Sequence, residues 1–80
     1  MDDQDILHRI TALVDEEHRL REEAPRMEDD HPSHERLRAL EVNLDQCWDL
    51  LRQRRALRHT GQRPDDAHVR DARTVEKYEQ

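Results

Sequence analysis

The chain is poor in residues that many small folds rely on. Its 80 residues include one cysteine, one glycine, one tryptophan, one tyrosine and no phenylalanine. A single cysteine excludes an internal disulfide and fits a reducing compartment. One glycine and three prolines leave few places for turns, which argues against a mixed fold. Long apolar runs are absent too, so we expect neither a signal peptide nor a membrane span, and a cytoplasmic protein.

Charged residues are abundant instead, at 42 % of the chain against 32 % for hydrophobic residues. This composition, rich in Leu, Arg and Glu, is typical of helical hairpins and coiled coils. The net charge of -6 is unevenly distributed: residues 1–30 carry -7, residues 31–63 carry +3 and residues 64–80 carry -2. Because proteins that bind nucleic acid are usually basic, this balance argues against nucleic acid as a partner.

The longest amphipathic segment covers residues 32–59. Its apolar residues recur at steps of three and four, which places them on one face of a helix: Leu37, Leu40, Leu44, Cys47 or Trp48, and Leu51. The alternation follows a heptad and predicts coiled-coil-like packing. Such a helix would be roughly 40 Å long. It needs a partner, because most helical stability comes from burial of the apolar face.

A first helix is expected over residues 3–23. The acidic residues Asp2, Asp3 and Asp5 favour its N-terminus, and Pro25 disfavours helix beyond Glu23. One stripe of this helix steps by four and three: Ile6, Ile10, Leu13, Glu17 and Leu20. Residues 24–31 form the connector. A connector this short makes the two helices antiparallel neighbours.

The hairpin geometry predicts which residues face each other. Their residue numbers should sum to about 57, so that Leu13 lies near Leu44 and Glu17 lies near Leu40 and Glu41. Some apolar residues lie off this seam and would be exposed in a monomer: Leu7, Val14, Leu50 and Leu57. We therefore expect a homodimer, most simply two hairpins that form a four-helix bundle.

The C-terminal part is expected to differ from the hairpin. We assign residues 1–60 to the hairpin and residues 61–80 to a flexible or docked tail, because Gly61 is a typical helix stop. A weak helix-start signal lies at residues 64–66. Val69, Val75 and Tyr78 are the only sizeable apolar residues beyond it, so the prediction is a mostly extended tail.

One stretch resembles a known family. The segment LDQCWDLLRQRRA, residues 44–56, together with ITALVDEEHRLRE upstream, is similar to a family of small actinobacterial proteins, domain of unknown function 2630. The resemblance covers most of the chain and implies a short helical hairpin. The family brings no established activity, so it implies no catalytic residues and no cofactor.

A partial likeness points toward an enzyme but fails on spacing. Residues 44–45, 50–51, 54–55 and 61 resemble the first helix of the all-helical chorismate mutases. In that family the interval from the Asp to the paired Leu and Arg is longer by about one residue, which rotates the helix faces by roughly 100°. The later helices of that pocket are also missing here. We therefore expect no enzymatic activity.

The arginines near the end of the second helix are candidates for partner binding: Arg52, Arg54, Arg55 and Arg58. They could dock an anionic partner. The alternative is internal bracing, because cations suit the negative end of a helix dipole and the hairpin brings them beside Asp2, Asp3 and Asp5. We favour the bracing interpretation.

A di-metal carboxylate site is a further alternative. Its ligands would be Asp15, Glu17, His18 and Glu41, doubled in a dimer. The simpler interpretation makes Glu17 a polar layer that fixes register. Cys47 is expected to fill the core, since no nearby basic residue is placed to form a thiolate.

The resulting hypothesis is a non-enzymatic helical interaction or adaptor protein without a cofactor. Trp48 is either a core or dimer anchor or an exposed hot spot for a partner. With Tyr78 and the arginines it completes the candidate partner-binding residues. The expected partners are a second copy and an unidentified protein. The runner-up is an anion-binding regulator that works through the Arg-rich end.

Overall fold

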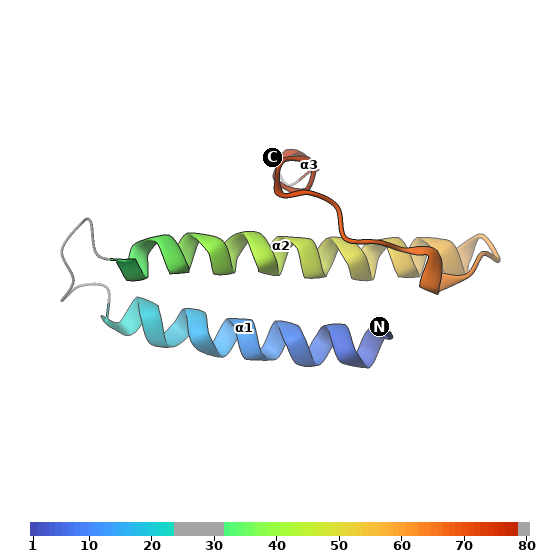
Figure 1. Cartoon of the computed structure of the whole chain (residues 1–80). Coiled ribbons are helices and arrows are strands. Elements are labelled where there is room, and N and C mark those ends of the chain that lie inside the picture. Colours follow the sequence, from blue (N-terminus) through green and yellow to red (C-terminus); the bar gives the residue numbers. More distant parts are fainter. Residues whose placement is uncertain (24–31, 79–80) are drawn as a thin grey trace.

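The computed structural model describes residues 1–23 and 32–78, with side chains up to residue 75. The described residues are mostly helical and contain no strand, which confirms an all-α chain with two long helices. These are α1 (Asp3–Glu23) and α2 (Pro32–His59), followed by the 3-10 turn η2 (Pro64–Asp66) and the short helix α3 (Ala72–Tyr78). Figure 1 shows α1 and α2 side by side and antiparallel. The predicted connector, residues 24–31, lies outside the described residues.

The N-terminus of α1 is closed by two aspartates. The backbone N–H of Asp5 donates to Oδ1 of Asp2 over 2.9 Å, and the N–H of Asp2 donates to Oδ2 of Asp5 over 3.2 Å. This reciprocal arrangement is a capping box, which satisfies N–H groups that have no partner within the helix. Asp3 is left available for another role, described below.

The end of α2 is fixed by Gly61. The N–H of Gln62 donates to the carbonyl of Leu57 over 2.8 Å, and the N–H of Gly61 donates to the carbonyl of Arg58 over 3.2 Å. This pair of bonds is a Schellman motif, and it requires the left-handed conformation that Gly61 adopts with φ at 75°. The chain therefore turns back toward α2 directly after the helix.

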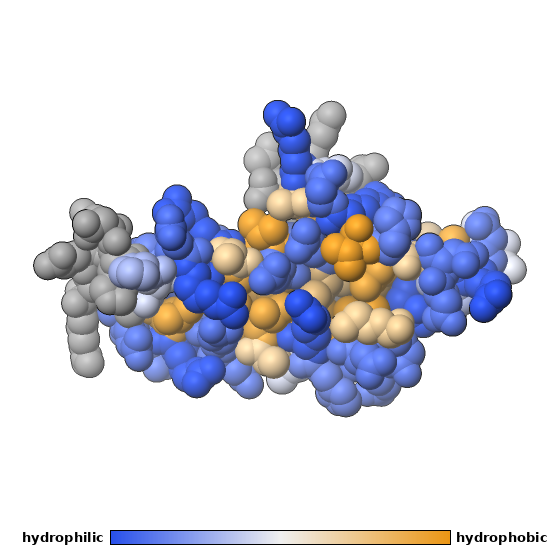
Figure 2. Space-filling model, viewed as in Figure 1, coloured by the Kyte–Doolittle hydropathy of each residue, from blue (hydrophilic) through white to orange (hydrophobic). Residues whose placement is uncertain are grey.

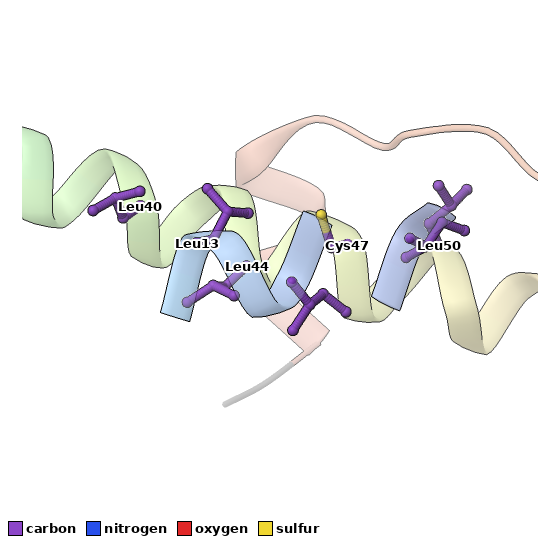
Figure 3. Packing of buried hydrophobic residues seen from close by; sticks show 7 residues of the cluster. Leu13, Leu40, Leu44, Cys47 and Leu50 are labelled. Carbon is purple, nitrogen blue, oxygen red and sulfur yellow. The ribbon is translucent and has the colours of Figure 1, made fainter. Parts of the chain in front are cut away.

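The core lies between the two long helices and consists of seven residues: Ile6, Ile10, Leu13, Leu40, Leu44, Cys47 and Leu50. Figure 3 shows Leu40, Leu44, Cys47 and Leu50 following one another along α2, with Leu13 of α1 among them. One expectation about α2 is corrected here. Leu50, expected to be exposed, is only 7 % exposed, because the core includes this side of α2.

Trp48 is not part of this core. Its exposed fraction is 45 %, whereas Cys47 is buried at 8 %. The sequence predicted that either Cys47 or Trp48 lies on the face of α2 that meets α1, and in the structure this residue is Cys47. A difference of one residue rotates a side chain by about 100° around the helix, which carries Trp48 to the flank. A core anchor is therefore the wrong interpretation of Trp48 within the single chain.

Cross-helix ion pairs report the alignment of α1 and α2. Arg54 contacts Asp3 over 2.5 Å, and the sum of their residue numbers equals the predicted value of about 57. Two further ion pairs have sums on either side of this value: Arg36 with Glu16 at 2.9 Å, and Arg21 with Glu41 at 2.6 Å. The hairpin register could therefore be predicted from the connector alone.

The C-terminal segment is more ordered than an extended tail. Residues 67–71 are extended, but residues 72–78 form α3, so the prediction of a mostly extended tail is wrong for them. Asp71 caps α3, since its Oδ1 accepts from the N–H of Thr74 over 2.8 Å. Val75 is fully buried and anchors α3, which packs against α2. Figure 1 shows the segment returning along α2.

The molecule is long and thin. Its principal extents are 50 × 24 × 16 Å, and the shortest is less than twice the roughly 10 Å diameter of one helix. The two long helices therefore form a single layer with two broad faces. Within the described ranges, no helix is long and apolar enough to cross a membrane.

Candidate functional site

One side of the hairpin carries exposed apolar side chains, and we call it the Trp48 face. On α1, Leu7, Val14 and Arg21 are spaced by seven residues and so lie on one stripe. On α2, Glu41 and Trp48 are also seven apart and share a stripe. The ion pair between Arg21 and Glu41 at 2.6 Å joins the two stripes, so both border the same side of the hairpin.

The apolar part of the Trp48 face is only partly covered. Leu7 and Trp48 are both exposed, while Val14 and Leu51 are half-buried against the core. A half-exposed tryptophan beside exposed aliphatic residues is an arrangement that binding surfaces favour, since tryptophan is enriched at binding hot spots. The described part of the chain places no other element over this face.

Two of the four residues proposed as metal ligands, Glu17 and Glu41, pair with an arginine. The guanidinium of Arg21 lies 2.6 Å from Glu41 and 3.6 Å from Glu17, so one cation already pairs with both carboxylates. Asp15 and His18 are exposed on α1. Among the described residues, no group of three or more histidine, cysteine or acidic side chains could hold a metal ion. Glu17 and Glu41 thus form a polar layer in which Arg21 is the cation.

The Arg-rich end divides into inward and outward side chains. Arg54 is only 7 % exposed, and its guanidinium contacts Asp3 over 2.5 Å and Asp65 over 3.0 Å. Arg58 donates to the other oxygen of Asp3 over 2.7 Å. These bonds from Arg58 and Arg54 lower the pKa of Asp3, and the bond from Arg54 lowers the pKa of Asp65. Arg54 therefore ties both α1 and η2 to α2.

Arg52 and Arg55 remain exposed, and within the described residues neither forms an ion pair. Arg55 follows Trp48 by seven residues, so it extends the Trp48 face toward the end of α2. The side chain of Tyr78, the other aromatic candidate, lies outside the described residues.

A small pocket lies on the side of the hairpin opposite the Trp48 face. It has a volume of about 160 Å³, similar to engineered cavities that hold a benzene-sized molecule, and is lined by Met1, Arg9, Asn43, Gln46, Cys47, Leu50 and Val69. Figure 2 shows apolar side chains along the line between the two long helices in this view. Arg36 bonds both carboxylate oxygens of Glu16 on the same flank, over 3.0 and 2.9 Å, and so lowers the pKa of that carboxyl.

Cys47 has a basic neighbour that the sequence did not reveal. Burial raises the pKa of its thiol, and the guanidinium of Arg9 opposes this rise by its charge and a hydrogen bond. Burial is the larger effect, so the thiol is protonated at neutral pH and Cys47 acts mainly as a core residue.

A polar strip along α2 was not identified from the sequence. Gln46, Asp49 and Gln53 follow at steps of three and four and hold the C-terminal segment, with Gln46 donating to the carbonyl of Arg70 over 3.1 Å and Gln53 to that of His68 over 2.7 Å. Asp49 is buried although charged. The helical spacing of these polar residues is visible in the sequence, but an apolar stripe is the usual sign of a contact face, so polar spacing predicts no contact.

These features define a class of small, all-helical hairpin proteins whose long helix also binds the C-terminal segment. The chain belongs to the family of proteins of unknown function DUF2630, whose pattern matches residues 2–80. This confirms the family resemblance carried by residues 44–56.

The relatives are mycobacterial. The chain is 48 % identical over 77 residues to the uncharacterized protein Rv0898c of Mycobacterium tuberculosis and, to the same extent, to the uncharacterized protein Mb0922c of Mycobacterium bovis. The alignment covers 95 % of this chain and 88 % of each relative. No solved structure matches the chain.

Proposed function

We propose that this protein is a non-enzymatic helical interaction protein that self-associates through the Trp48 face. In the dimer, two hairpins pack as a four-helix bundle with coiled-coil-like contacts and act as an adaptor for a further protein. The observation that carries the proposal is the 45 % exposure of Trp48 on a stripe that the Arg21–Glu41 ion pair aligns with Leu7 and Val14. Covering this face would add to the stability of a thin, single-layer hairpin, because a small domain buries little apolar surface on its own.

The pattern of charges along α2 favours a second copy as the occupant of this face. If two α2 helices cross antiparallel at Trp48, facing residue numbers sum to about 96, and each Arg55 then lies opposite the partner's Glu41. The interface is isologous, so this attraction occurs twice. A parallel arrangement would instead place each Arg55 beside the partner's Arg55, which is unfavourable.

The proposal is tested by sedimentation velocity of the purified chain over a wide concentration range. The parent chain should shift from monomer to dimer, and Trp48→Ala should weaken the association at least tenfold, because truncation of a hot-spot tryptophan typically costs more than 2 kcal/mol. Val69→Ala is the matched control, since Val69 is 61 % exposed on another side. A parent chain that is monomeric throughout, or equal effects of both substitutions, would overturn the proposal.

The anion-binding alternative has weaker support. Arg54, the centre of the expected cluster, turns inward to Asp3 and Asp65, and Arg58 also contacts Asp3. Arg52 and Arg55 remain to meet an anion. If this alternative were correct, Arg52→Gln with Arg55→Gln would abolish a salt-sensitive binding of polyphosphate while helicity stayed unchanged.

A further inference from the structure

The C-terminal segment occupies a second contact face of α2. We call residues 64–75 the strap; it comprises η2, the extended residues 67–71 and the start of α3. The strap lies on the polar strip of Gln46, Asp49 and Gln53, and both η2 and α3 contact α2. Figure 1 shows it running back along α2 from the end of that helix.

The polar strip binds the backbone of the strap. Gln53 donates to the carbonyl of His68 over 2.7 Å and accepts from the N–H of the same residue over 3.4 Å. Gln46 donates to the carbonyl of Arg70 over 3.1 Å. Two side-chain amides thus pair with alternate residues of an extended chain. Backbone pairing of this kind holds extended peptides in many recognition modes, and it is largely independent of the side chains of the peptide.

Side-chain contacts add selectivity at three points of the strap. Asp65 pairs with the buried Arg54 over 3.0 Å, Arg70 lies 3.6 Å from the buried Asp49, and Val75 is fully buried. A buried charge without a partner is costly, so Asp49 and Arg54 favour an occupant that supplies the opposite charge. The three anchors of the strap are each five residues apart.

The outer surface of the strap nevertheless reaches solvent. Its contacts are mostly polar and close to solvent: Asp65 is 69 % exposed in its side chain, and Val69 is exposed too. Within its described side chains, Ala67 and Val75 are the residues that bring apolar contact. Each ion pair of the strap joins one buried side chain to one that reaches solvent, so a competing peptide must supply the same charges and an apolar anchor like Val75.

We propose that this face of α2 is a binding site for an extended peptide of a partner protein, and that the strap occupies it in cis as an autoinhibitory mimic. The partner segment carries an acidic residue, an arginine and a β-branched aliphatic residue at the spacing of Asp65, Arg70 and Val75. This site is separate from the Trp48 face, so it does not depend on self-association.

The test uses the full chain and a fluorescently labelled synthetic peptide of residues 64–78. Val75→Asp removes the buried anchor of the strap and should open the face, so the peptide should bind this variant at least tenfold more tightly than the parent chain. Val69→Asp is the matched control: it introduces the same charge at an exposed valine of the same strap and should leave peptide binding as in the parent. Circular dichroism monitors folding of each variant.

A second substitution tests the contact mode. In the Val75→Asp chain, Gln53→Ala should weaken peptide binding several-fold, whereas Arg52→Ala, exposed on another side of α2, should not. If Val75→Asp unfolds the chain, the near-isosteric Val75→Thr serves in its place with a smaller gain in affinity. The proposal is overturned if the peptide binds the opened chain no better than the parent, or if Gln53→Ala has no effect.

A third result would show that the strap of a second copy occupies this face of α2. A dimer of the parent chain that excess peptide dissociates, and that Trp48→Ala leaves intact, would show that two copies exchange their straps. That result would overturn occupation in cis while leaving the peptide-binding face in place.

Discussion

Arg54 illustrates how a single side chain can connect three elements. It lies in α2 and contacts a carboxylate at the start of α1 and another in η2, while its guanidinium is almost fully buried. The sequence predicted that basic residues at the end of α2 contact the acidic N-terminus of α1, and in the structure Asp3 makes these contacts. Which arginine turns inward depends on the rotation of α2 around its axis, and the sequence alone did not fix this rotation.

Arg54→Gln should lower the free energy of unfolding by about 1–3 kcal/mol, because two charge-assisted hydrogen-bond partners lose their cation. The loss stays in this range since Asp3 and Asp65 both have access to water. Urea denaturation followed by circular dichroism measures it. Arg52→Gln is the control and should change stability by less than about 0.5 kcal/mol. Equal effects of the two substitutions would show that Arg54 is not a structural tie.

The lowered pKa of Asp3 predicts that the stability of the fold depends on pH. Hydrogen bonds from Arg58 and Arg54 stabilise its carboxylate, so the folded pKa lies below the unfolded one. The contribution is therefore present above the unfolded pKa, about 4, and is lost as pH falls through the folded value. Urea denaturation at several pH values should show a difference in stability between the parent and Asp3→Asn that is widest near neutral pH and narrows as the pH falls through the lowered pKa of Asp3. A difference independent of pH would contradict this account.

At the scale of elements, α2 presents three distinct faces. The apolar face of α2 meets α1, the polar strip meets the strap, and the Trp48 face remains exposed. The spacing of apolar residues predicted the first face well. Leu50 was misplaced because the helices present a broader stripe than the strict seam of steps of three and four. The prediction of a flexible or docked tail left the docking site on α2 unidentified, because the contacts come from side-chain amides, which carry little signal in a hydropathy pattern.

Gly61 sets the direction in which the chain leaves α2. Gly61→Ala should destabilise the fold by about 1 kcal/mol, because an alanine at φ of 75° is strained although its Cβ has open space. Gly61→Asn should lose less, since asparagine tolerates this conformation better. Thermal and urea unfolding measure both. If alanine and asparagine are equally harmless, the Schellman motif does not direct the strap.

At the scale of the whole molecule, the two sides of the hairpin differ in how far they are covered by the rest of the chain. One side is covered in part by the chain's own strap, and the other leaves Trp48 exposed. All-helical architecture and hairpin alignment followed from composition, periodicity and a short connector. The apolar residues off the seam also predict a homodimer, and the exposed Leu7 and Trp48 are consistent with that prediction, which stays a proposal.

The most direct test of self-association is the emission of Trp48 as a function of protein concentration. The chain contains one tryptophan, so the signal reports this residue alone. Burial of Trp48 between two copies should shift its emission to shorter wavelength and protect it from iodide quenching as concentration rises, and dilution should reverse both changes. Emission and quenching of an exposed tryptophan at every concentration, up to the highest that can be reached, would contradict the account.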